Sequence, residues 1–471
     1  MELKVNTQHP EYEAMADKWQ RCRDTVSGQD AVHAAGTKYL PMLKDQTTDD
    51  YNAYRTRTLF YNCTWRTISA LSGMIFRKEP VIDASDSVKT LLEDVTMSGK
   101  SFYTFAQQTA IEILTSGRQG ILVDYPSQSV EGLTAADAEK LNLRPTMQAY
   151  PAESIINWKT EWVGNATVLT LIVLTESAAV DGDEFEHKTE TRYRVLDLKD
   201  GKYRVRVFRI DDNKEAEQVG ADLFPLMNGK PLDFIPFYFC GVDDTTPDTD
   251  EPPLIDLVDA NLSHYRLDAD HKHGLHFTGL PTGYVCGYTP EKQGDKLYIG
   301  SAAMMVFPDP EANVGYLEYT GQGLTAIASE KEKLEQYMAI LGARLLTTEK
   351  KDTETSQTAQ IHRAGESSIL TSIAKSIGKA FTNALNTFSR WAGSDQECSV
   401  ALNEEFLPPG ITPQELTALL AGWQMGAPGL SDQGLFDILQ KREVVAADVT
   451  LEDEQARIAA KPIPKPGNVG E

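Results

Sequence analysis

The stretch LIDLVDANLSHYRLDADHK, residues 254–272, decides how the rest of the chain is interpreted. Its apolar residues recur at steps of three and four, which predicts an amphipathic helix. Its apolar side carries Leu254, Leu257, Val258, Leu262, Tyr265 and Ala269. Just before it, residues 243–253 read DDTTPDTDEPP, an acidic linker that contains prolines and has no periodicity. We therefore expect one folded unit to end at this linker and a helix to follow it.

A small β-rich module and two more helices are expected after this helix. Residues 274–324 are rich in glycine and contain the strand-like phrases PTGYVCGY, KLYIGSAAMMVFP and VGYLEY. Helical periodicity returns over residues 326–346. The polar loop TTEKKDTETSQ, residues 347–357, then precedes a long helix predicted over residues 358–391. The order is helix, β module, helix, polar loop and long helix.

The first 240 residues predict helices followed by strands. Apolar periodicity indicates helices over residues 11–25, 48–76 and 101–116, the second ending before Pro80, which cannot continue a helix. Strand patterns follow at residues 120–125, 167–175, 191–198, 203–210 and 233–240. Together these segments predict an α+β protein with an antiparallel sheet inserted among helices.

Bulk composition narrows the class of protein. The chain has 471 residues and a formal net charge of -24, which would repel DNA on average and excludes a conventional DNA-binding regulator. Its five cysteines are odd in number, widely spaced and without a CxxC pair, so we expect reduced thiols. The N-terminal residues do not have the order of a signal peptide, and we expect neither a membrane span nor export from the cytoplasm.

Three local patterns resemble sites for chemistry in part. MSGKSF, residues 97–102, contains the GKS of a phosphate-binding loop, but Asp94 stands where that motif needs its first glycine, so a helix cap at Ser101 is expected. His264, Asp268 and His271 share a helix face, with His273 and His276 close behind. No cysteine partner or clear catalytic carboxylate accompanies them, which favours solvated or interface histidines. The acidic linker lacks the spacing of an EF-hand. We expect no enzyme activity, no cofactor and no metal.

Several phrases together resemble the portal proteins of tailed bacteriophages, in a portal-like branch found in phages and prophages. They are PPLIDLVDANLSHYRLDADHKHGLHFTGLPTGYVCG at residues 252–287, GYLEYTGQGLTAI at 315–327, LGARLL at 341–346, ETSQTAQIHRAGESSIL at 354–370 and YRTRTLFYNCTWRTISALSGMIFRKEP at 54–80. The resemblance covers most of residues 51–393 and matches the order of elements given above. The C-terminal region is the least supported part.

The resemblance implies the portal fold, with a helical and sheet wing, a helical stem, a β-rich clip and a helical crown. The implied parts are the wing at 1–253, a stem helix at 254–273, the clip at 274–325, a second stem helix at 326–346, a tunnel loop at 347–357, a long wing helix at 358–393, and the crown and tail at 394–471.

The resemblance also implies site residues. The tunnel loop would place Thr347, Thr348, Lys350, Lys351 and Thr353 near DNA phosphates. The stem would contribute Asp259, His264, Arg266, Asp270, Lys331 and Lys333 to a channel wall, and the clip would use Tyr284, Tyr288, Lys292, Lys296 and Tyr298 at an interface. A solvated surface loop remains an equal alternative for the tunnel-loop residues.

The resemblance implies that copies of this chain form a ring at one capsid vertex of a virion. In this family the ring usually has twelve subunits, and the protein is made in the bacterial cytoplasm. Such a ring conducts double-stranded DNA without sequence specificity during packaging and ejection. Its partners are the terminase large subunit, a head-completion or tail adaptor protein, and the major capsid and scaffolding proteins. Two alternatives stay open: another structural virion protein, such as an adaptor or minor capsid subunit, and a metal-dependent hydrolase that uses the histidine cluster.

Overall fold

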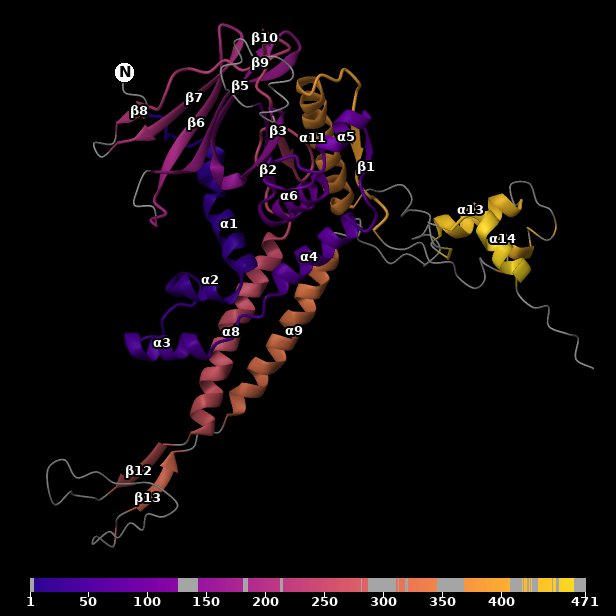
Figure 1. The fold of residues 1–471 in the computed structure, drawn as a ribbon. Helices are drawn as coiled ribbons and strands as arrows, with labels where there is room; N and C mark the ends of the chain where they lie inside the picture. The colour runs from indigo at the N-terminus through magenta and orange to yellow at the C-terminus, as the bar shows by residue number, and fades with distance from the viewer. Residues whose placement is uncertain are drawn as a thin grey trace, which may run out of the picture. The chain divides into compact units, whose positions relative to one another are not determined.

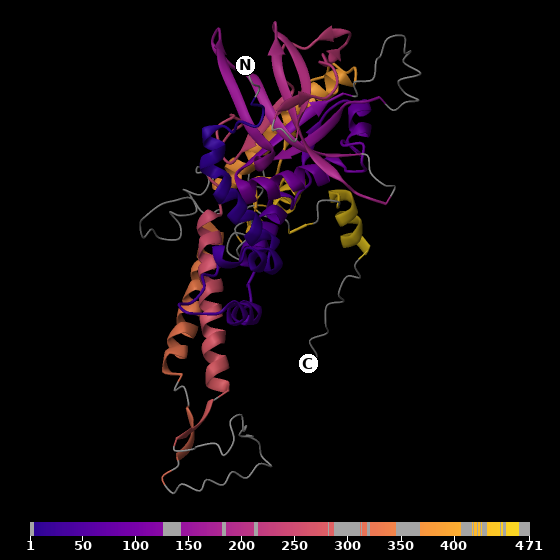
Figure 2. The ribbon, with the colours of Figure 1, turned by 90° about the vertical axis from the view of Figure 1, so that its left-hand side faces the viewer.

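The structure is a computed structural model that describes residues 4–125, 143–180, 185–211, 215–280, 282–286, 311, 313–317, 321–344, 368–406 and parts of 417–460. The chain divides into two compact units, Met1–Glu404 and Glu405–Glu471. Among the described residues of the first unit, helices and strands are mixed, which agrees with the α+β prediction (Figures 1 and 2). No helix among these residues is both long enough and apolar enough to traverse a bilayer.

Helices dominate the start of the first unit, in the order α1, α2, η1, α3, α4, β1, α5 and α6. Their bounds are α1 Pro10–Ser27, α2 Gln29–Ala34, η1 Gly36–Lys38, α3 Thr48–Arg57, α4 Cys63–Ile75, β1 Val81–Asp83, α5 Asp86–Leu91 and α6 Phe102–Ser116. The expected cap at Ser101 is confirmed, since its side chain accepts a hydrogen bond from Thr104 N at 3.3 Å.

The predicted helix over residues 48–76 is wrong as a single element, because the chain breaks between α3 and α4. The connecting residues 58–62 continue the apolar spacing, with Leu59 and Phe60, but their amides bond elsewhere. Leu59 N donates to Asp268 at 2.9 Å and Phe60 N donates to Gln29 at 3.2 Å. Asn62 then caps α4 by accepting from Trp65 N at 2.9 Å. Tertiary hydrogen bonds therefore replace the helical ones.

Two separate antiparallel sheets follow rather than one. The five-stranded sheet has the order β4-β5-β6-β7-β8, and the three-stranded sheet has the order β11-β2-β3. The strands of the larger sheet are β4 Ile155–Val163, β5 Ala166–Ala179, β6 Thr189–Lys199, β7 Lys202–Ile210 and β8 Ala216–Gln218. Those of the smaller sheet are β2 Arg118–Asp124, β3 Thr146–Pro151 and β11 Phe237–Gly241. A short helix, η2 Ala152–Ser154, and a hairpin of β9 Leu226–Met227 and β10 Lys230–Pro231 lie outside both sheets. The strand predicted over residues 233–240 thus pairs with β2, which brings it beneath the helices.

The long α11, Ile369–Trp391, packs against the three-stranded sheet and α6. The ring of Phe381 lies 4.9 Å from that of Phe102 and 5.9 Å from that of Phe105, centroid to centroid. Ser368 caps α11, so the helix begins there in the described part of the chain, and residues 358–367 of the predicted helix lie outside it. After α11, β14 Ser399–Ala401 pairs with β1. Residues 399–401 therefore belong to the first unit, and the crown and tail at 394–471 stay a prediction.

The helix predicted at residues 254–272 is confirmed and is longer, because α8 spans Ile255–Gly279. The β module contains the hairpin of β12 Thr282–Cys286 and β13 Asn313–Leu317, and α9 Gln322–Arg344 matches the helix predicted at 326–346. The second unit contains α13 Asp432–Lys441 and α14 Leu451–Ala460, two of the short helices expected near the C-terminus. There Trp423 donates to Asp432 at 2.8 Å.

The acidic linker between β11 and α8 is packed against other segments of the first unit. Arg118, 1% exposed, lies between the rings of Trp158 and Phe239 and donates to Pro247 O at 2.6 Å. Ser376 of α11 donates to Asp244 O at 2.7 Å. These bonds come from a strand and a helix far away in the sequence. They fix the point from which α8 starts.

Gly117 offers a test of this packing. It ends α6 with a φ of +78°, and a Cβ at this position would lie 3.0 Å from the backbone oxygens of Asp250 and Glu251. We expect Gly117→Ala to lower the free energy of unfolding by about 2–4 kcal/mol, because left-handed strain adds to the clash with the linker. Urea unfolding followed by circular dichroism measures this change.

Gly201 provides the matched control, since it has a φ of +71° and nothing within 4 Å of its added Cβ. Gly201→Ala should cost only about 1–2 kcal/mol, from the backbone strain alone. Equal losses in the two variants would show that the linker does not press on Gly117.

Candidate functional site

The candidate site is the pair of long helices α8 and α9, which run side by side in opposite directions (Figures 1 and 2). His264 Nε2 lies 3.0 Å from Glu335 Oε1, and Asp268 pairs with Lys331. Farther along, Gly274 approaches Leu324. As the residue number increases along α8, from His264 to Gly274, the number of the contacting residue on α9 decreases, from Glu335 to Leu324. The two helices are therefore antiparallel with a fixed register. The hairpin β12–β13 joins their far ends.

Asp268 connects three segments of the chain, although it is only 3% exposed. Its carboxylate accepts from Leu59 N at 2.9 Å in the connector between α3 and α4, and it pairs with Lys331 of α9. Lys272, one turn farther along α8, lies 3.4 Å away. Burial by itself would raise the pKa of Asp268, but these donors outweigh burial and lower it. The carboxylate is therefore charged and fully engaged.

Asn261, about two turns before Asp268 on α8, binds the same connector and is fully buried. Its Oδ1 accepts from the backbone N–H groups of Cys63 and Thr64, both at 3.1 Å, and from the Thr64 hydroxyl at 3.0 Å. Its Nδ2 donates to Tyr61 O at 2.8 Å. Asn261 thus satisfies the unpaired amides at the start of α4, as a helix cap would.

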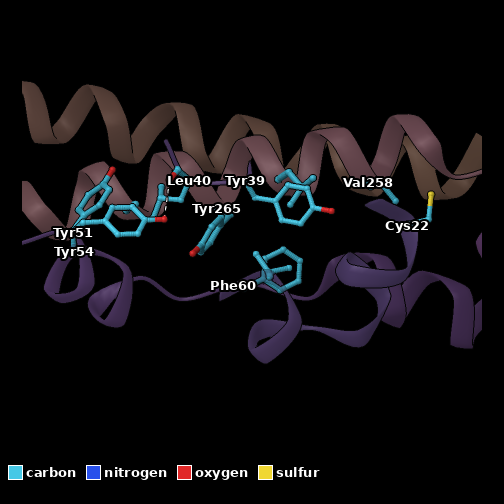
Figure 3. Packing of buried hydrophobic residues seen from close by; sticks show 11 residues of the cluster. Cys22, Tyr39, Leu40, Tyr51, Tyr54, Phe60, Val258 and Tyr265 are labelled. Carbon is cyan, nitrogen blue, oxygen red and sulfur yellow. Dashed lines mark hydrogen bonds between the residues drawn. The ribbon is translucent and has the colours of Figure 1, made fainter. Parts of the chain in front are cut away.

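An aromatic cluster packs the N-terminal helices against α8. Figure 3 shows Tyr265 and Val258 of α8 among side chains from α1 to the α3–α4 connector. The cluster contains Cys22, Val32, Tyr39, Leu40, Tyr51, Tyr54, Phe60, Val258, Leu262, Tyr265 and Ala269. Inside it, the Tyr51 hydroxyl donates to Leu40 O at 3.0 Å. The part of α8 from Val258 to Ala269 is therefore packed against the N-terminal helices.

The residues predicted for a channel wall lie in three different surroundings. His264 and Lys331 point into the α8–α9 contact and serve packing. Lys333 is exposed, and its Nζ lies 3.5 Å from a carboxylate oxygen of Glu330. The remaining predicted residues contact the N-terminal helices: Asp259 lies 3.2 Å from Arg21, Arg266 Nε donates to Tyr39 O at 2.9 Å, and Asp270 accepts from Tyr54 at 2.6 Å. Their role in a channel stays a prediction.

The exposed charged side chains described on α9 are mainly acidic. They belong to Glu330, Glu332 and Glu335, beside the exposed Lys333, and Glu335 also contacts His264 of α8. Tyr337 and Ile340 of the same helix are 45% and 56% exposed, so apolar side chains also reach the surface of α9. The exposed surface of α9 is therefore negative and partly apolar.

Most residues predicted for the clip and the tunnel loop lie outside the described residues. In the clip, Tyr284 of β12 is 40% exposed, whereas Tyr288, Lys292, Lys296 and Tyr298 are not described. All of the tunnel-loop residues named above, Thr347, Thr348, Lys350, Lys351 and Thr353, also lie outside. The interface and DNA roles of these side chains stay predictions.

In the structure, residues of each of the three local patterns form hydrogen bonds or ion pairs within the chain. Asp94 accepts from Gly99 N at 3.0 Å, so a carboxylate occupies the turn of MSGKSF. Asp250 of the acidic linker accepts from Val242 N at 2.6 Å. His264 and Asp268 are paired with α9 as described above. In the part of the chain that the structure describes, no group of three or more histidine, cysteine or acidic side chains could hold a metal ion.

Sequence reasoning missed Asn261 and assigned no packing role to Asp268. The spacing of these residues could have indicated that they are buried. Asn261, His264 and Asp268 follow one another at steps of three and four, the same spacing as the apolar residues of the helix. Polar residues on a helix side that neighbours bury need partners there. The sequence does not say which segments supply those partners.

Comparisons with known proteins match the same region. A family model described as "Domain of unknown function (DUF4055)" matches residues 253–392, which include α8, the hairpin, α9 and α11. No curated protein matches the chain. Among solved structures, the chain is similar to one titled "Virion of native gene transfer agent (GTA) particle", with 11% identity and a TM-score of 0.36. It is also similar to one titled "Neck of native GTA particle computed with C12 symmetry", with 12% identity and a TM-score of 0.35. The alignments cover 93% and 88% of this chain, and 100% and 98% of the other chains.

Removing the charge of Asp268 tests its connecting role. We expect Asp268→Asn to lower the free energy of unfolding by about 3 kcal/mol, because Lys331 would be left largely buried without a counter-charge. Urea unfolding measures the loss. The control is Glu330→Gln, which removes an exposed pair with Lys333 and should cost less than about 1 kcal/mol. A loss for Asp268→Asn no larger than that of the control would contradict the role.

The same residue predicts a pH dependence. Because the pKa of Asp268 is lowered in the folded protein, its charge stabilises the fold above the ordinary carboxyl pKa, and this contribution is lost as the pH falls through the lowered value. The stability difference between wild type and Asp268→Asn should be constant between about pH 5 and 7 and shrink below about pH 4. Thermal unfolding across this range checks the trend, and a difference that persists unchanged at pH 3 would oppose it.

Proposed function

We propose that this chain is a portal-type subunit of a tailed phage or phage-like particle. In this proposal it forms a ring at one capsid vertex, through which double-stranded DNA enters and leaves. The observation that carries the proposal is the antiparallel pair of α8 and α9 with a β hairpin between their far ends. That arrangement is what the resemblance of the sequence to portal proteins leads us to expect of a stem and clip.

The helix pair has the dimensions and stiffness that a tunnel wall needs. With 25 residues, α8 spans about 37 Å at 1.5 Å per residue. The part of α8 from Val258 to Ala269 is held in place by the contacts of Asp268 and Asn261 and by the aromatic cluster around Tyr265. A wall built from such helices can stand around DNA without being reshaped by it.

The charge of the helix pair favours a conduit rather than a DNA-binding surface. The exposed carboxylates of α9, Glu330, Glu332 and Glu335, would repel phosphates, and the whole chain carries a net charge of -24. A wall that repels DNA on average allows it to slide, whereas a basic wall would retain it. The exposed Lys333 supplies at most a weak, salt-sensitive contact.

The proposed partners follow from the same role. The terminase large subunit and a head-completion or tail adaptor would dock on the ring, which would sit in the virion among major capsid and scaffolding proteins. The chain itself would carry out no reaction. The energy for DNA movement would then come from the terminase.

Electron microscopy of the purified full-length protein tests the proposal. We expect annular particles with an opening wide enough for duplex DNA, and a reconstruction in which α8 and α9 surround the symmetry axis. Rings in which these helices lie away from the axis would instead indicate an adaptor or another structural virion protein. Monomers or dimers that bind stoichiometric metal would favour the hydrolase and overturn the proposal.

A further inference from the structure

A polar cleft of about 460 Å³ lies between α1, η1 and α8. Three cations line it, one from each of these elements: Arg21, Lys38 and Arg266. The buried side chains of Tyr39 and Leu262 complete its wall. The cleft therefore combines a shaped, partly apolar surface with positive charge from segments far apart in the sequence.

The three cations are only partly engaged within the chain. Arg266 donates through Nε to Tyr39 O at 2.9 Å, which fixes its guanidinium and leaves the two terminal nitrogens without a partner among the described residues. Lys38 stands 5.5 Å from the Tyr39 ring centroid and has no ion-pair partner in that part of the chain. Arg21 pairs with Asp259 at 3.2 Å, but its buried Nε has no hydrogen-bond partner. Donor capacity remains for an anion.

The charge balance of the cleft selects the kind of anion. Against its three cations stand two carboxylates, Asp17 and Asp259, so the cleft is positive by one charge in a chain of net charge -24. A single carboxylate neutralises that excess, and a guanidinium held by its Nε can bind a carboxylate with its other nitrogens. A nucleic acid backbone, with its dense phosphates, would meet Asp17 and Asp259 as well. The cleft fits one acidic side chain better than DNA.

We propose that this cleft receives an aspartate or glutamate side chain from a second copy of the chain. The inference rests on the proposed ring and names one of its contacts. Copies with 69 acidic and 45 basic residues repel each other at long range, so their association needs local points of opposite charge. A fixed arginine, a lysine with no ion-pair partner among the described residues and a shaped wall make this cleft such a point.

Chemical cross-linking tests the contact directly. Full-length protein labelled with nitrogen-15 is mixed with unlabelled protein before assembly and treated with a carbodiimide, which joins amines to carboxylates in direct contact. We expect a peptide pair that links Lys38 to an aspartate or glutamate and combines one light and one heavy chain. Such a mixed pair can arise only between copies, because a link to Asp17 of the same chain has a single label.

Charge reversal provides the second measurement. Lys38→Glu should raise the protein concentration needed for half-assembly at least about tenfold, because a carboxylate would then face a carboxylate. Lys202→Glu is the matched control, since Lys202 is exposed on β7 and does not line the cleft. Wild-type sedimentation profiles at the same salt concentration give the reference.

The outcomes separate this inference from the proposed function. Mixed Lys38 cross-links together with weakened assembly of Lys38→Glu support the cleft contact. Normal rings without mixed cross-links, and equal assembly of both variants, overturn the cleft and leave the ring standing. Mixed Lys38 cross-links without rings support the contact and overturn the ring. If neither rings nor mixed links form, both are wrong.

Discussion

The buried carboxylate of Asp268 is the constraint on which the candidate stem depends. It must be paired, because an isolated charge in such a position would cost several kcal/mol. Its partners lie on α9 and on the connector before α4, so satisfying it brings three segments together in one register. Hydrophobic contacts alone would let two helices slide past each other by a turn. A buried ion pair makes such a slip costly, which is its best-attested use.

Asn261 shows how the same constraint shapes the N-terminal part of the chain. Its amide satisfies the backbone of residues 61–64, so the helix that the apolar spacing predicts is exchanged for a bent connector. The bend lets Phe60 join Tyr265 in the aromatic cluster. Polar contacts therefore set the direction of the chain, and apolar contacts stabilise the result.

Much of the secondary structure could be predicted from the sequence, because periodicity and caps act locally. The helix at residues 254–272, the cap at Ser101 and most strands of the larger sheet follow from patterns a few residues long. The break after Arg57 could not be predicted, since Asp268 and Asn261 lie 209 and 198 positions away from Leu59 and Cys63, whose amides they bind. For the same reason, the pairing of β11 with β2 and the partners of Asp268 could not be foreseen.

The acidic linker shows why composition misleads about packing. Residues 243–253 have the charges and prolines of a free segment, yet their carbonyl groups accept hydrogen bonds from Arg118 and Ser376. A backbone carbonyl can be held by a buried donor whatever side chain it belongs to, and composition does not record this. Because α8 begins directly after the linker, its orientation is tied to the three-stranded sheet and α11. A force on the far end of α8 would therefore be transmitted to the three-stranded sheet and α11 through hydrogen bonds to the main chain.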